Sequence, residues 1–155
     1  MVHISLMAIK SISLSLIALA LLIAPPASSG QASSQSHCLS YEPTVVTLSG
    51  TLVRKTFPGP PDYESVKNGD KPETSWFLEL PASLCVNEDP TQPDLNPKRS
   101  GVHEIQLILE PKQYQQHKDI VGSVVNASGT LVGEHTAHHH TSVLLIVHTL
   151  RKRMN

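Results

Sequence analysis

Four histidines within six residues form the part of this sequence best suited to chemistry. His135, His138, His139 and His140 follow Glu134 in a segment between two apolar runs. Imidazole is largely neutral at pH 7 and is a common ligand for zinc, copper and nickel. In an extended turn His138 and His140 face the same side, and His135 can fold back to join them. Three imidazoles completed by water or by Glu134 would make a zinc or copper site.

The same histidines have two other interpretations. At a loop tip between strands they can hydrogen-bond to neighbouring backbone and serve only the turn. They can also contact a ligand or respond to pH. If the cluster does bind a metal, protons compete for the imidazoles, and the affinity falls steeply below their pKa. The spacing alone leaves the three roles open.

A second candidate site is aromatic. The connection 54–75 contains Phe57 and Tyr63 among prolines and glycines, and Trp76 follows it directly. Such a segment is not expected to form regular structure over most of its length, and a loop this long in a small domain is usually functional or disordered. We predict that Phe57, Tyr63 and Trp76 contact a ligand or partner. The alternative is that they fasten the loop to the domain.

No sequence pattern typical of a catalytic site is found. The sequence has no G-x-S-x-G, no H-E-x-x-H and no phosphate-binding glycine loop, and its carboxylates are scattered over predicted loops. A hydrolase in which histidine-bound metal activates water would depend on the histidine cluster alone. We therefore predict no catalytic residues and favour a protein that is not an enzyme.

The first residues of the chain are typical of an export signal. Lys10 supplies a positive charge, residues 12–23 form an apolar core, and two prolines with small residues follow. Cleavage after Ala32, or alternatively after Ser29, satisfies the preference for small residues, and we take 1–32 as the signal peptide. The apolar run is shorter than the roughly 20 residues that span a bilayer. We expect a periplasmic or secreted protein with no membrane span after cleavage.

The composition of the remaining chain excludes one class of partner. About 120 residues are enough for one compact domain, and loss of Lys10 leaves a net charge of about −2. Nucleic-acid binding depends on many Lys and Arg contacts with phosphate. We therefore predict no nucleic-acid partner. We also expect the protein to be a monomer, and residues 151–155 to form a solvated basic tail.

The two cysteines, Cys38 and Cys85, are expected to form a disulfide in an exported chain. The disulfide would close a loop of nearly 50 residues, which stabilises the folded state by roughly 4 kcal/mol in the chain-entropy model. A pair of reactive or metal-binding thiols is the alternative, but the sequence has no C-x-x-C motif and no nearby third ligand.

The pattern of apolar and turn-forming residues predicts an all-β domain with one short helix. Strands are expected at 45–53, from 76 to about 86, at 102–109, 123–132 and 142–150, with a helix between Pro111 and Gly122. This order, β-β-β-α-β-β, is that of the five-stranded OB-fold barrel. We predict an OB-like barrel over 45–150 after an entry segment at 33–44. Another small β-barrel or a sandwich is the alternative.

A repeated pentapeptide supports this fold. Ser-Gly-Thr-Leu-Val occurs at 49–53 and again at 128–132. In an OB barrel the first and fourth strands pair, and each bends at a glycine to close the cylinder. A chance match or an old duplication would give the same repeat. In this fold the loops after the first and fourth strands lie at the binding face. We therefore expect the connection 54–75, which carries the aromatic residues, to lie close to the segment that carries the four histidines.

Five distinctive motifs are spread along the chain: Cys-Leu-Ser-Tyr-Glu-Pro at 38–43, Thr-Phe-Pro-Gly-Pro-Pro-Asp-Tyr-Glu-Ser at 56–65, Glu-Ile-Gln-Leu at 104–107, Gly-Thr-Leu at 129–131 and His-His-His-Thr at 138–141. They resemble those of a bacterial family of exported domains of unknown function. The resemblance covers nearly the whole mature chain and implies a bacterial envelope or secreted setting.

Together these features predict a non-enzymatic binding module of the bacterial envelope. It would present the connection 54–75 and the segment with the four histidines to an envelope protein, a glycan or a small ligand. The alternative is a periplasmic metal-binding protein that holds zinc, copper or nickel through His135, His138, His139 and His140.

Overall fold

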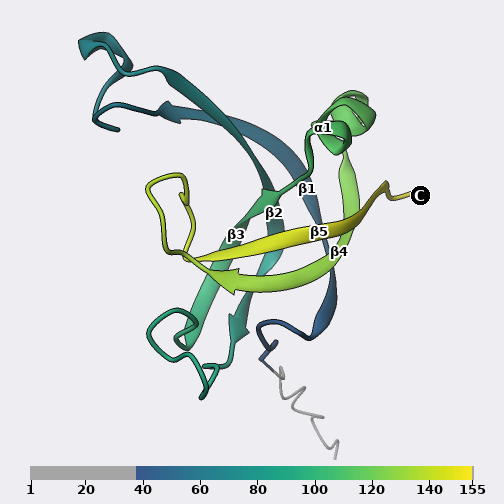
Figure 1. Cartoon of the computed structure of the whole chain (residues 1–155). Coiled ribbons are helices and arrows are strands. Elements are labelled where there is room, and N and C mark those ends of the chain that lie inside the picture. The colour runs from purple at the N-terminus through teal and green to yellow at the C-terminus, as the bar shows by residue number, and fades with distance from the viewer. Residues whose placement is uncertain (1–37, 155) are drawn as a thin grey trace, which may run out of the picture. The chain divides into compact units, whose positions relative to one another are not determined.

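A computed structural model describes residues 38–154, so the predicted leader and its cleavage site lie outside the described residues. The order of elements is the predicted one, three strands, a short helix and two strands (Figure 1). The elements are β1 (Val45–Pro58), a 3-10 turn η1 (Val66–Asn68), β2 (Pro72–Val86), β3 (Arg99–Ile108), α1 (Pro111–His117), a 3-10 turn η2 (Lys118–Ile120), β4 (Val124–Gly133) and β5 (Val143–Lys152). Because β5 extends to Lys152, the first two residues of the predicted basic tail belong to a strand.

The five strands form one closed ring of sheet in the order β1-β2-β3-β5-β4. Neighbouring strands are antiparallel except β3 and β5, which are parallel. The first and fourth strands pair over Val45–Thr51 and Val124–Thr130, as the repeated pentapeptide predicted. The ring brings the connections after β1 and β4 to neighbouring positions.

The glycine of each repeat stands where a side chain would collide with the backbone of another strand. A Cβ on Gly129 would clash with the carbonyl oxygen of Ile146, and a Cβ on Gly50 with that of Glu79. The ladder between β4 and β5 shifts register between Ser128 and Gly129, which confirms the predicted irregularity there. At Thr51, next to Gly50, β1 passes from β4 to β2.

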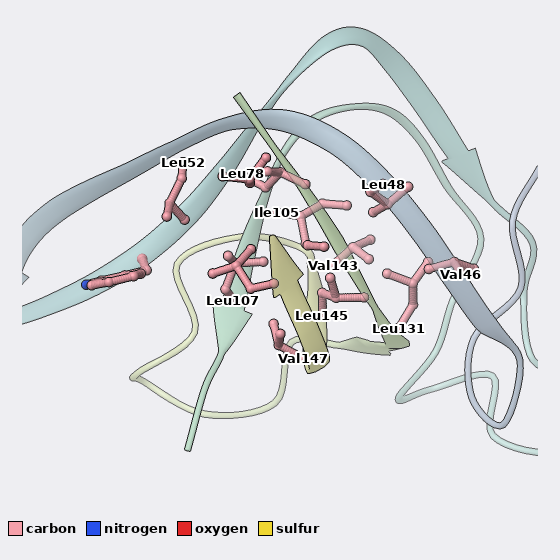
Figure 2. Packing of buried hydrophobic residues seen from close by; sticks show 14 of the residues in the cluster. Val46, Leu48, Leu52, Leu78, Ile105, Leu107, Leu131, Val143, Leu145 and Val147 are labelled. Carbon is pink, nitrogen blue, oxygen red and sulfur yellow. The ribbon is translucent and has the colours of Figure 1, made fainter. Parts of the chain in front are cut away.

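The inner face of the ring holds the hydrophobic core (Figure 2). Residues directly opposite one another on paired strands share a face, and the inward positions form rows of fully buried aliphatic side chains. These include Leu52, Leu78, Ile105, Leu131 and Leu145. The core therefore combines side chains from all five strands.

The connection 54–75 differs from its prediction. β1 continues to Pro58 and β2 begins at Pro72, so the strands form a hairpin arm that continues past the other strands (Figure 1). The two prolines face each other at the end of the ladder, where a missing amide hydrogen costs least. Only residues 59–71, which we call the hairpin loop, lie between the strands.

The short helix α1 closes one end of the ring. Pro111 is its first residue, and Glu110 and Gln113 form a capping box at its start. Tyr114 of α1 meets the ring of Trp76 edge-on, with centroids 5.3 Å apart. Trp76 is 5% exposed and belongs to the core cluster. Trp76 was predicted to contact a ligand; its place on the inner face of β2 buries it under the helix, which favours the alternative that it fastens this segment to the domain.

The predicted disulfide between Cys38 and Cys85 is present, and it joins residues 47 positions apart. Beside it, Leu39 forms a parallel bridge with Val86, and Tyr41 is buried, with its hydroxyl donating to the carbonyl of Pro97. Burial raises the pKa of Tyr41 above its ordinary value. Residues 38–44 are thus part of the packed domain. No helix among residues 38–154 is long and apolar enough to cross a membrane.

Candidate functional site

The hairpin loop and the loop between β4 and β5 meet through one histidine. We call residues 134–142 the histidine loop. Nε2 of His138 lies 3.1 Å from the hydroxyl of Tyr63, and Nδ1 lies 2.7 Å from a carboxylate oxygen of Glu73. The side chain of His138 is 54% exposed and that of Glu73 24%. An imidazole on one loop is therefore held between a phenol and a carboxylate on the hairpin arm.

A second contact joins the same two segments. The ring of His140 stacks on that of Phe57, with centroids 3.8 Å apart and planes only 8° from parallel. Phe57 also packs against Phe77, whose centroid is 5.7 Å away. Phe77 is fully buried although it lies outside the core cluster, since it is next to Trp76 and points to the opposite face of β2. The outer face of β2 is therefore covered by aromatic packing at this point. We call Phe57, Tyr63, Glu73, His138 and His140 together the two-loop surface.

The histidine loop is held onto β3 by one buried amide side chain. Gln106 is 6% exposed; its carbonyl oxygen accepts from the backbone N–H of His140 at 2.7 Å, and its amide donates to the backbone carbonyl of His138 at 2.9 Å. The hydroxyl of Thr141 accepts from the backbone N–H of Gln106 at 2.9 Å. These bonds fix the backbone on both sides of the histidines.

The hairpin loop is organised around a carboxylate. Asp70 is 6% exposed and accepts backbone N–H groups of Asp62, Glu64 and Ser65 at 2.7 to 2.9 Å. Between them Tyr63 has a φ of 59°, the left-handed region that side chains other than glycine rarely occupy. Such a conformation costs roughly 1–3 kcal/mol and persists only where its surroundings enforce it. The loop enforces it here and turns the phenol toward His138.

We expect acid to release this loop. The N–H bonds from Asp62, then Ser65 and Glu64, lower the pKa of Asp70. A carboxyl whose folded pKa is lowered stabilises the loop above its unfolded pKa of about 3.9, and this contribution disappears as the pH falls through the folded pKa. Asp70→Ala should remove the stabilisation at every pH. Amide exchange at residues 62–65 should then be fast in the variant at pH 6 and slow in the wild type, and equal rates would contradict this role.

The four histidines do not gather as the sequence suggested. His138 and His140 are committed to Tyr63 and Phe57, whereas His135 and His139 contact each other edge-on, with centroids 4.7 Å apart. Within residues 38–154 no group of three or more His, Cys, Asp or Glu is placed to hold a metal ion. The structure thus does not bring His135, His138 and His140 together, because their rings turn to separate partners.

Burial lowers the pKa of two of these imidazoles. For His139 burial is the largest cause, followed by the neighbouring His135 and His138. For His140 burial again dominates, opposed by the charge of Glu73. The Nε2 atom of His140 is buried without a hydrogen-bond partner. The arrangement on Phe57 therefore favours the neutral imidazole of His140.

Zinc titration at neutral pH should accordingly show only weak binding. Gathering three imidazoles requires His138 to leave Tyr63 and the histidine loop to leave Gln106, and these losses reduce the net affinity for the metal. Calorimetry of the mature, tag-free chain measures this directly. Stoichiometric submicromolar binding that is lost in His138→Ala would contradict the geometry and restore the metal-binding interpretation.

The sequence did not single out Glu73 and Gln106. Glu73 lies within the segment expected to be irregular, and only its strand register places it next to His138. Gln106 did carry a signal, because it is polar within the apolar run Ile105–Ile108. A buried polar side chain in a strand needs a partner, and here the partner is the histidine loop.

The fold and the site define a mostly β, disulfide-linked domain with two interlocked surface loops. Residues 104–151 match the family model described as Domain of unknown function (DUF4431). The match runs from β3 to β5 and includes α1 and the histidine loop. It fits the predicted resemblance to a family of small domains of unknown function. No curated protein matches the chain.

Proposed function

We propose that this protein is an exported, non-enzymatic binding module of the bacterial envelope with an OB-fold, and that its two-loop surface binds a ligand. The observation that carries the proposal is the chain Tyr63–His138–Glu73, which joins segments 65 to 75 residues apart at an exposed position. A ring of five strands in the order β1-β2-β3-β5-β4, with a helix between β3 and β4, supports the OB-fold assignment.

The chemistry of the two-loop surface favours a polar ligand that has an apolar face. The phenol of Tyr63 and the carboxylate of Glu73 lie 3.1 Å and 2.7 Å from the two ring nitrogens of His138, and together the three groups offer hydrogen-bond donors and acceptors. Beside them the Phe57–His140 stack offers aromatic surface. The hydrogen bonds of Asp70 and Gln106 hold both loops in place, which reduces the entropy lost on binding. Among the candidate ligands we favour a glycan of the bacterial envelope.

The test is binding of the mature chain to an array of envelope glycans, including soluble peptidoglycan fragments. We expect Tyr63→Ala and His138→Ala each to weaken retention at least tenfold, because each removes a hydrogen-bonding group of about 1.4 kcal/mol or more from the surface. Both variants should melt close to the wild type, since neither side chain is part of the core cluster.

His103→Ala is the matched control, because His103 is an exposed histidine on β3 outside both loops. It should bind like the wild type. Equal retention of all four proteins, or no retention of the wild type by any glycan, would count against the proposed function.

A further inference from the structure

A second candidate binding site lies where β1 and β2 separate. β1 pairs with β2 only from Thr51 onward, opposite Glu79, and its first half pairs with β4 alone. A cleft of about 400 Å³ opens there, lined by residues that include Ser49, Thr51, Glu79, Pro81 and Arg153. The histidine loop joins the opposite ends of β4 and β5. The cleft is therefore separate from the two-loop surface.

One wall of the cleft is an unpaired strand edge. The backbone N–H of Leu52 donates to Ser123, and its carbonyl accepts from Gly122, so Leu52 directs both groups to the β4 side. Alternate residues of a strand direct these groups to opposite sides. Val45, Thr47 and Ser49 therefore point their backbone groups away from β4, toward the gap between β1 and β2, and no described strand pairs with them on that side. Of the three, Ser49 lines the cleft.

The other end of the same gap already accommodates extended backbone. At Val86 one edge of β2 pairs with Arg99 of β3, so its other edge faces the gap. Leu39 occupies that edge: its N–H donates to Cys85 and its carbonyl accepts from Asn87, both at 2.8 Å. The segment before β1 thus forms a parallel β-bridge with this edge of β2.

One charged group at the cleft is free to pair with an acidic ligand. Glu79 is engaged by Lys55, whose Nζ lies 3.3 Å away and also contacts Glu104. Arg153 is exposed, and its guanidinium has no ion-pair partner among residues 38–154. Pro81 on the β2 wall has no amide hydrogen to pair with β1. The cleft therefore combines an open strand edge with one guanidinium that has no ion-pair partner among the described residues.

We propose that this cleft binds an extended peptide segment with an acidic side chain. The peptide adds as a strand along Val45–Ser49, where backbone hydrogen bonds hold it. Its carboxylate pairs with the guanidinium of Arg153.

The probe is the peptide acetyl-Val-Thr-Val-Glu-Val-Thr-amide, titrated into the ¹⁵N-labelled, disulfide-bonded mature chain. We expect saturable binding with shifts at the amides of residues 45–51. A peptide with lysine in place of glutamate should bind at least about tenfold more weakly, because the charge pairing becomes repulsive. A peptide with proline on either side of the glutamate should not bind, because it cannot form the ladder.

Two variants make the test specific. Arg153→Glu should reverse the preference and bind the lysine peptide more tightly than the glutamate peptide. Thr47→Pro should abolish binding while leaving the β1–β4 ladder intact, because the amide it removes faces the gap between β1 and β2 and not β4. If Thr47→Pro does not fold, the reversal in Arg153→Glu decides alone. Equal binding of the proline peptide, an unchanged preference in Arg153→Glu, or no saturable binding up to millimolar peptide would each overturn the proposal.

Discussion

Replacing Cys38 and Cys85 by alanine is expected to lower the free energy of unfolding by about 4 kcal/mol. The disulfide closes a loop of 47 residues, and opening it restores conformational freedom to the unfolded chain. It also fastens the segment that carries Leu39 to β2 and brings Tyr41 into the core. A loss of this size is a large share of the stability of a single domain.

Urea unfolding measures this effect. The midpoint for Cys38→Ala/Cys85→Ala should fall well below that of the oxidised wild type, and the wild type with its disulfide reduced should unfold at nearly the same urea concentration as the variant. The melting temperature should drop by on the order of 15 °C or more. A change below about 1 kcal/mol in both comparisons would mean that the packing of residues 38–44 holds without the crosslink.

Gln106→Leu is expected to detach the histidine loop while the ring of strands stays folded. Leucine has a similar size but leaves the N–H of His140 and the carbonyl of His138 without the partners they have now. Each orphaned backbone group costs about 1–3 kcal/mol if the loop stays closed. The loop should therefore open, which exposes Phe77 and moves His138 away from Tyr63.

Amide exchange and ligand binding report this opening separately. Exchange at His140 should accelerate at least about a hundredfold in Gln106→Leu, in line with a loss of roughly 3 kcal/mol or more. Retention of the ligand that binds the two-loop surface should fall as far as in His138→Ala. Gln116→Leu, on the exposed side of α1, is the matched control and should change neither. Unchanged exchange at His140 would show that other contacts hold the loop.

The order of elements and the pairing of β1 with β4 could be predicted because local patterns carry them. Each of these patterns indicates the structure of the residues next to it: the β-branched runs indicate strands, Pro111 and Gly122 the ends of the helix, and the repeated glycines the bends. The hairpin arm was missed because prolines suggested a loop, whereas Pro58 and Pro72 stand at the end of a ladder. Which residues face the core in that segment depends on register, and so the burial of Trp76 was missed as well.

The candidate site could be predicted only in part, since its contacts join distant segments. The sequence indicated two loops, and the structure brings them together through Tyr63 and His138. The spacing of the histidines could not show that Glu73 and Phe57 on the hairpin arm would each take one imidazole. A metal site and a polar contact surface use the same residue types, and only the positions of their partners separate the two.

We propose that the two loops form one binding surface. The most direct measurement is an NMR titration in which the envelope glycan retained on the array is added to the ¹⁵N-labelled mature chain. Residues 57–63 and 134–141 are expected to shift together, with one common affinity that falls at least tenfold in Tyr63→Ala. Shifts confined to one loop, or found only at the cleft between β1 and β2, would contradict the proposal.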